Sequence, residues 1–155
     1  MKIVFDEETG LLIPGEHKLS IEEFEEAFVY NSKRKTIFNG FQKLLKIFRE
    51  IACSHIYADG SFVTQKPLPG DIDVCWHMDT DSTIRQKQLE TLFKLCPPLL
   101  LLNEKKNRDY IQQEFCADVF PANMQEGGSG LLFKDFFQKD KYTDTPKGII
   151  VIDLI

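Results

Sequence analysis

The chain has 155 residues, of which 43% are hydrophobic, and its formal net charge at pH 7 is -5. This length predicts a single domain over residues 1–155, and the acidic balance excludes a broad electrostatic grip on nucleic acid, while leaving room for a local basic groove. The N-terminal residues are too charged for a signal peptide and no apolar run reaches membrane-spanning length, so we expect a cytoplasmic protein with no membrane partner.

The first third of the chain predicts two helices. A turn is expected at Pro14-Gly15. Ser20 and Glu23 then form a capping box that begins a helix over residues 20–30. Apolar residues then recur at helical spacing over residues 33–52, with basic residues on the other faces. We expect these basic residues to be solvated, and the alternative is a phosphate-binding role. The two helices, over about residues 20–52, are expected to pack on a sheet.

The rest of the chain alternates short strands, turns and helices. Strands are expected over residues 54–58 and 71–76, with a turn-rich stretch between them. Ser82 is expected to cap a third helix, and the apolar run Leu99–Leu102 predicts a buried strand. This mixture predicts an α+β fold. The remaining expected elements are helices over residues 108–115 and 131–138 and strands over residues 116–120 and 148–154.

Two aspartates in the strand at residues 71–76 are candidate metal ligands. Period-two alternation sends Asp71 and Asp73 to one face and the apolar residues between them to the other. Their alpha carbons would lie roughly 6.5 to 7 Å apart, a separation from which both carboxylates can reach one divalent cation or a close pair of cations. The alternative is an exposed strand start, with Asp71 capping the preceding turn.

Gly60 and Ser61 precede this pair, with nine residues between Ser61 and Asp71. A glycine allows close backbone approach, and a serine offers a hydroxyl and an amide to a phosphate. Gly-Ser alone is a common turn, but this turn together with the two aspartates at this spacing is much more specific. Lys66, in the same loop, could neutralise a phosphate, although a loop lysine is more often solvated.

The combination of Gly60-Ser61, a nine-residue spacer and the run Asp71 to Val74 resembles the motif of the DNA polymerase beta-like nucleotidyltransferase superfamily. The chain is also similar, over most of its length, to a small family of uncharacterised bacterial nucleotidyltransferase-like proteins. The resemblance implies a palm-like mixed β-sheet flanked by helices. Asp59 departs from the superfamily pattern, which usually has a hydrophobic residue there, and this indicates an altered phosphate site or an additional acidic group.

The resemblance also implies a two-metal mechanism. Asp71 and Asp73 would hold Mg²⁺ or Mn²⁺ on a nucleoside triphosphate such as ATP, while Gly60 and Ser61 would hold its outer phosphates. A third carboxylate on a neighbouring strand completes such sites, and Asp118 is the best match here. The alternative for Asp118 is a strand-edge aspartate whose hydrogen bonds are satisfied locally.

The leading hypothesis is therefore a metal-dependent nucleotidyltransferase that modifies a protein or RNA hydroxyl, by analogy in a toxin-antitoxin or phage-defence module. Because little of the chain is left to bind the acceptor, a partner protein could complete the site. The rival hypothesis is a non-catalytic, antitoxin-like regulator that binds nucleotide or protein with the same fold. A metal-dependent nuclease would also use clustered carboxylates, but it does not require the Gly-Ser turn.

Overall fold

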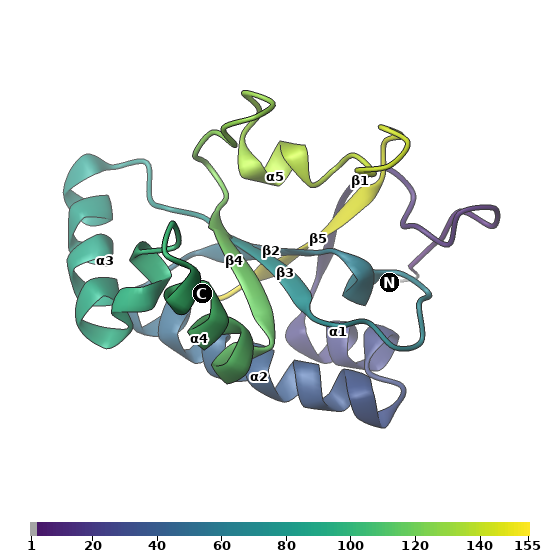
Figure 1. Cartoon of the computed structure of the whole chain (residues 1–155), viewed down its shortest axis with the longest axis horizontal. Coiled ribbons are helices and arrows are strands. Elements are labelled where there is room, and N and C mark those ends of the chain that lie inside the picture. Colours follow the sequence, from purple (N-terminus) through teal and green to yellow (C-terminus); the bar gives the residue numbers. More distant parts are fainter. Residues whose placement is uncertain (1–2) are drawn as a thin grey trace.

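The computed structural model describes residues 3–155 and shows a five-stranded mixed sheet flanked by helices (Figure 1). The strand order is β1-β5-β2-β3-β4. The outer pairs β1–β5 and β3–β4 are parallel, whereas β2 runs antiparallel to both of its neighbours. The predicted α+β fold is confirmed. The strands are β1 (Gly15–Leu19), β2 (His55–Asp59), β3 (Ile72–Trp76), β4 (Ala117–Pro121) and β5 (Gly148–Asp153).

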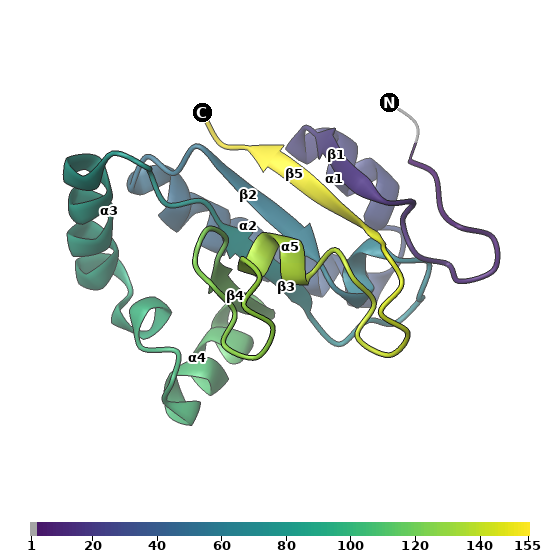
Figure 2. The same ribbon diagram turned by 90° about the horizontal axis from the view of Figure 1, so that it is seen from above.

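The helices lie mainly on one side of the sheet (Figures 1 and 2). On that side are α1 (Ile21–Phe28), α2 (Ser32–Glu50) and α4 (Lys105–Phe115). Helix α3 (Ser82–Leu95) stands at one end of the sheet, while the opposite face is covered only in part, by the segment that carries the short α5 (Phe133–Phe136). No helix among residues 3–155 has the length and apolar character needed to cross a bilayer.

The main core fills the space between the sheet and the helices. Strand alternation directs Ile72, Val74 and Trp76 into it, as the sequence predicted, and all three are buried. Phe48 of α2 stacks on Trp76 with ring centroids 5.6 Å apart. Phe24 of α1 packs among further phenylalanine rings from α1, α2 and the stretch after β2. This core fixes the inward side of β3, and the outward side carries Asp73 together with Cys75, which is buried in a second, smaller hydrophobic cluster.

Local capping and a close helix contact set the positions of the helices. The predicted capping box is confirmed, since Ser20 and Glu23 each accept a backbone N–H from the other. Helix α3 is capped by the side chain of Asp81, so the predicted cap at Ser82 is wrong by one residue. A side chain at Gly40 would place its Cβ 2.5 Å from a backbone oxygen of α4, and so α2 and α4 pack backbone against backbone there.

Two predicted elements differ from the structure, and one observed strand was not predicted. Leu99–Leu102 is not a strand: Pro97–Leu100 forms a single 3-10 turn, because two prolines fix φ and remove the N–H donors that a strand needs. The predicted helix over residues 131–138 is only Phe133–Phe136. Strand β1 was not predicted, since its exposed and charged edge residues lack the apolar alternation of a half-buried strand.

Candidate functional site

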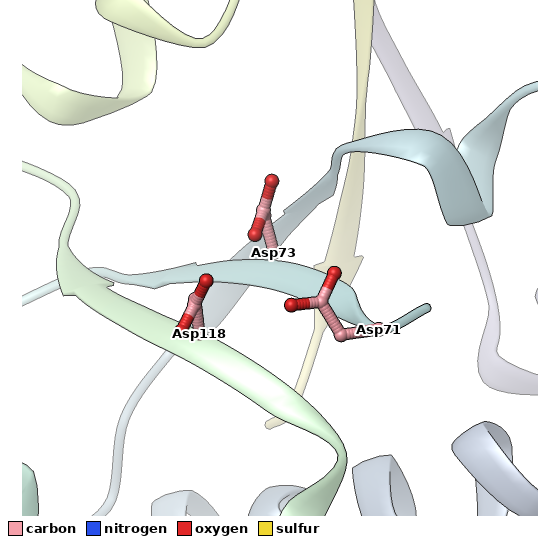
Figure 3. Close-up of side chains that lie close together, drawn as sticks. All are labelled: Asp71, Asp73 and Asp118. Carbon is pink, nitrogen blue, oxygen red and sulfur yellow. The ribbon is translucent and has the colours of Figure 1, made fainter. Parts of the chain in front are cut away.

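Three aspartates meet on the sheet face turned away from α2 and α4 (Figure 3). Asp73 of β3 and Asp118 of β4 are direct neighbours in the parallel register, and Asp71 immediately precedes β3. One carboxylate oxygen from each lies within 4.8 Å of the others. The alternation argument for Asp71 and Asp73 is thus confirmed, and Asp118 lies on the neighbouring strand beside them.

Gln112 of α4 connects two of these carboxylates. Its side-chain Nε2 donates hydrogen bonds to Oδ2 of Asp71 at 2.7 Å and to Oδ1 of Asp118 at 2.8 Å. A glutamine amide has two N–H donors, so this arrangement uses both and engages one oxygen of each carboxylate. The second oxygen of each stays available to a metal. Sequence analysis missed Gln112, because one glutamine in a polar helix carries no local signal of its role.

Burial and mutual repulsion disfavour the charged form of the cluster. Burial, followed by the charges of Asp71, Asp59 and Asp118, raises the pKa of Asp73 to about 7. Burial also raises the pKa of Asp71, while the hydrogen bond from Gln112 acts in the opposite direction. Carboxylates held together in this way favour either a shared proton or a bound cation. The site is therefore suited to a divalent cation.

The backbone after β2 approaches the cluster closely. Gly60 has a φ of +83°, in the left-handed region, and a Cβ there would lie 2.5 Å from Oδ2 of Asp73. Glycine is therefore required on two grounds, backbone conformation and space. Ser61 follows at the start of a short 3-10 turn, and both residues line the same cleft as Asp73 and Lys66. The structure thus brings the Gly-Ser turn next to the aspartates.

Arg34 holds the loop that follows this turn. Its guanidinium donates hydrogen bonds to the backbone oxygens of Phe28, Phe62, Thr64 and Lys66 at 2.5 to 3.0 Å. The prediction that the basic residues of α2 are all solvated is wrong for Arg34, which has no exposed surface. A planar fork of donors suits several carbonyl groups at once, and so the arginine fixes the path of the loop.

A cleft of about 760 Å³ contains these groups. The aspartates and the Gly-Ser turn line one part of it, and residues from the segment before β5 line another. Its volume lies within the usual range for small-molecule sites. The lining also carries four lysines, two further aspartates and one exposed tyrosine: Lys66, Lys139, Lys141, Lys147, Asp140, Asp144 and Tyr142.

Asp59 brings a fourth carboxylate to this region. It is the last residue of β2, pairs with Asp73 across the strands, and is only 1% exposed. Lys147 places its Nζ 3.5 Å from Oδ2 of Asp59. Burial raises the pKa of Asp59 to about 6, against the lowering effect of the Lys147 ammonium. Asp59 is therefore an additional acidic group beside the cluster, which is one of the two possibilities that its sequence position indicated.

The sequence profile of one protein family matches residues 3–153. The chain belongs to DUF6932, a family of unknown function. No curated protein and no solved structure matches the chain. The matched part of this DUF6932 chain contains the aspartates, the Gly-Ser turn and the cleft lysines. Carboxylates beside ammonium groups in one cleft suit a ligand that combines a cation with an anion, such as a metal-bound phosphate.

Proposed function

We propose that the chain is a metal-dependent nucleotidyltransferase, which moves a nucleoside monophosphate from a nucleoside triphosphate to a hydroxyl of a protein or a nucleic acid. The observation that carries this proposal is the placement of the Gly60-Ser61 turn directly against the Asp71, Asp73 and Asp118 cluster. The sequence motif supports the same function, because its spacing of Gly60-Ser61 and Asp71 to Val74 resembles that of the nucleotidyltransferase superfamily.

The donor set fits Mg²⁺ or Mn²⁺. Mg²⁺ binds oxygen ligands at about 2.0–2.1 Å, so ligands on opposite sides of one ion lie about 4.2 Å apart. One carboxylate oxygen from each of the three aspartates lies within 4.8 Å of the others. Asp71, Asp73 and Asp118 would therefore hold the divalent cation, which would supply positive charge to the phosphates and to the reacting oxygens.

The residues of the cleft would divide the work of the transfer. When bound, the metal would neutralise charge on the phosphates. Gly60 and Ser61 would hold the outer phosphates, Lys66 would offset their charge, and Asp118 would position the acceptor hydroxyl and accept its proton. The hydroxyl oxygen forms a bond to the α-phosphorus while the bond from that phosphorus to its bridging oxygen breaks. Pyrophosphate leaves with the electron pair of the broken bond.

The acceptor and the biological setting belong to the same proposal. We place the activity in the cytoplasm, where nucleoside triphosphates are abundant, with a protein or RNA as acceptor. A partner protein would supply acceptor contacts beyond those of this small domain. By analogy, a toxin-antitoxin or defence module is the setting that we propose.

A labelling experiment tests the proposal. The purified protein is incubated with Mg²⁺ or Mn²⁺, cell lysate and each α-labelled nucleoside triphosphate in turn. We expect the wild type to transfer label. The rate of transfer by Asp73→Asn should be at least about 100-fold lower, because one metal ligand is lost. Asp109→Asn is the matched control, since Asp109 is an exposed carboxylate of α4 paired with Lys105.

The outcomes separate the competing functions. Full transfer by Asp73→Asn would refute the metal assignment. Metal-dependent nucleotide binding without any transfer by the wild type would favour the non-catalytic regulator. Label transferred by wild type and Asp109→Asn alone would establish the activity and identify both the nucleotide and the acceptor class.

A further inference from the structure

Lys147 differs from the other lysines of the cleft in how firmly it is held. It directly precedes β5, and its backbone N–H donates to the carbonyl oxygen of Gln138 at 2.9 Å. Its side chain is only 13% exposed, although lysine side chains usually extend into solvent. The backbone contact and the burial together fix where the ammonium lies.

The partner of Lys147 explains this burial. Asp59 is 1% exposed, and neither of its carboxylate oxygens accepts a hydrogen bond of standard geometry from residues 3–155. The ammonium of Lys147, 3.5 Å from Oδ2, is therefore the compensating charge. Asp59 immediately precedes Gly60, so this ammonium is anchored beside the turn to which the proposed function assigns the outer phosphates.

Two interpretations of this ion pair differ in what they predict. In the first, Lys147 only neutralises a buried aspartate. In the second, it also presents charge to the cleft, whose lining it forms. An ammonium has three N–H donors, and one carboxylate oxygen at 3.5 Å does not use them all. The position of Lys147 at the cleft wall favours the second interpretation, since a purely structural counter-ion needs no access to the cleft.

We propose that Lys147, positioned by Asp59, binds the outer phosphates of a polyphosphate substrate. This inference rests on the proposed function and adds to it the residue that would contact the leaving pyrophosphate. Asp59 is a positioning residue: it holds the ammonium in a defined place before the substrate arrives, which lowers the entropic cost of binding. The departure at Asp59 from the usual hydrophobic residue then has a physical reason, because a hydrophobic residue could not hold a lysine there.

A double-mutant comparison separates the two interpretations. Asp59→Asn removes the buried charge that requires neutralisation, and Lys147→Met keeps most of the side-chain volume without the ammonium. If Lys147 is only a counter-ion, Asp59→Asn and the double variant will bind a phosphate ligand equally well. If Lys147 contacts phosphate, the double variant will bind it more weakly than Asp59→Asn.

The ligand for this test is inorganic tripolyphosphate in the presence of Mg²⁺, titrated by calorimetry. We expect the Kd to rise about tenfold or more in Lys147→Met, and by a similar factor from Asp59→Asn to the double variant, as for loss of one charge-assisted contact. Lys147→Arg should restore most of the affinity. Lys18→Met is the matched control, because Lys18 pairs with Asp153 at 2.6 Å and 66% of its side chain is exposed.

Equal binding by Asp59→Asn and the double variant would overturn the inference, as would a wild type that does not bind tripolyphosphate. The double variant carries no unpaired buried charge, so it also guards against a misfolded Lys147→Met protein. Tripolyphosphate has no nucleoside, and its binding is therefore independent of transfer. Binding through Lys147 without label transfer would refute the proposed function alone, whereas transfer with binding that is independent of Lys147 would refute this inference alone.

Discussion

Replacing Asp73 by asparagine should stabilise the metal-free protein at pH 8 and change its stability little near pH 4. Burial and neighbouring carboxylates raise the pKa of Asp73 from 3.8 to about 7. Well below the ordinary pKa of 3.8, this carboxyl is largely protonated in both the folded and the unfolded chain. Between about pH 4 and pH 7 the unfolded chain releases the proton while the folded chain keeps it, so stability falls as pH rises. Above about pH 7 this loss of stability is complete. Asparagine carries no ionisable proton, so the Asp73→Asn variant does not lose stability in this way.

The size of the effect follows from the shift. At 1.36 kcal/mol per pKa unit, a rise from 3.8 to about 7 corresponds to roughly 4 kcal/mol. Partial exposure and screening by solvent reduce this, and we expect about 2 kcal/mol at pH 8. For a chain of this size, that free energy corresponds to an increase of about 4–8 °C in Tm.

Thermal unfolding with a chelator at pH 4.5 and pH 8 measures this difference, with Asp109→Asn as the surface control. Addition of Mg²⁺ at pH 8 should raise the Tm of the wild type more than that of Asp73→Asn, because the cation relieves the repulsion among the wild-type carboxylates. A Tm difference between wild type and Asp73→Asn that is equal at both pH values would refute the reasoning. A less stable Asp73→Asn protein at pH 8 would refute it as well.

Three further predictions concern the residues around the cluster. Gly60→Ala should lower the Tm by about 3–8 °C, because a left-handed φ of +83° costs about 1–2 kcal/mol and the new Cβ would meet Asp73. Gly70→Ala is the control and should change the Tm little, since the space around Gly70 is open. Arg34→Met should lower the free energy of unfolding in urea by about 3–5 kcal/mol, because it leaves buried carbonyl groups without donors. Arg34→Lys should not restore this stability, because lysine lacks the planar set of donors. Full stability of Arg34→Lys would argue against the role of the guanidinium. Gln112→Ala should weaken Mg²⁺ binding by about 10- to 100-fold in calorimetry, since two carboxylates lose their shared donor, and unchanged affinity would show that Gln112 does not orient them.

Local rules predicted the parts of the structure that depend on local geometry. Asp71 and Asp73 share a face because strand side chains alternate, and this holds in any sheet that contains the strand. The capping box of Ser20 and Glu23 likewise needs only one helical turn. The apolar composition of Leu99–Leu102 predicted a strand, but the two prolines before this run favour a 3-10 turn instead.

The remaining site residues depend on tertiary structure. Arg34 has the sequence context of a solvated helix face, and its burial arises only because the loop after β2 folds over it. Gln112 lies only six residues before Asp118, but it reaches Asp71 across 41 residues. Lys147 likewise reaches Asp59 from a segment distant in sequence, and no spacing rule connects these residues. Asp59 and Lys147 become neighbours because β2 pairs with β5, and Asp71 and Asp118 become neighbours because β3 pairs with β4.

Helix α2 touches both supports of the cleft. Near its start, Arg34 grips the loop of the Gly-Ser turn, and further along, Gly40 lies against the backbone of Phe115, one turn from Gln112. Helix α2 therefore connects the loop of the Gly-Ser turn with the helix whose Gln112 contacts the carboxylates. An axial shift of α2 would therefore move both sides of the cleft together, because one helix contacts the loop of the turn and the helix that carries Gln112.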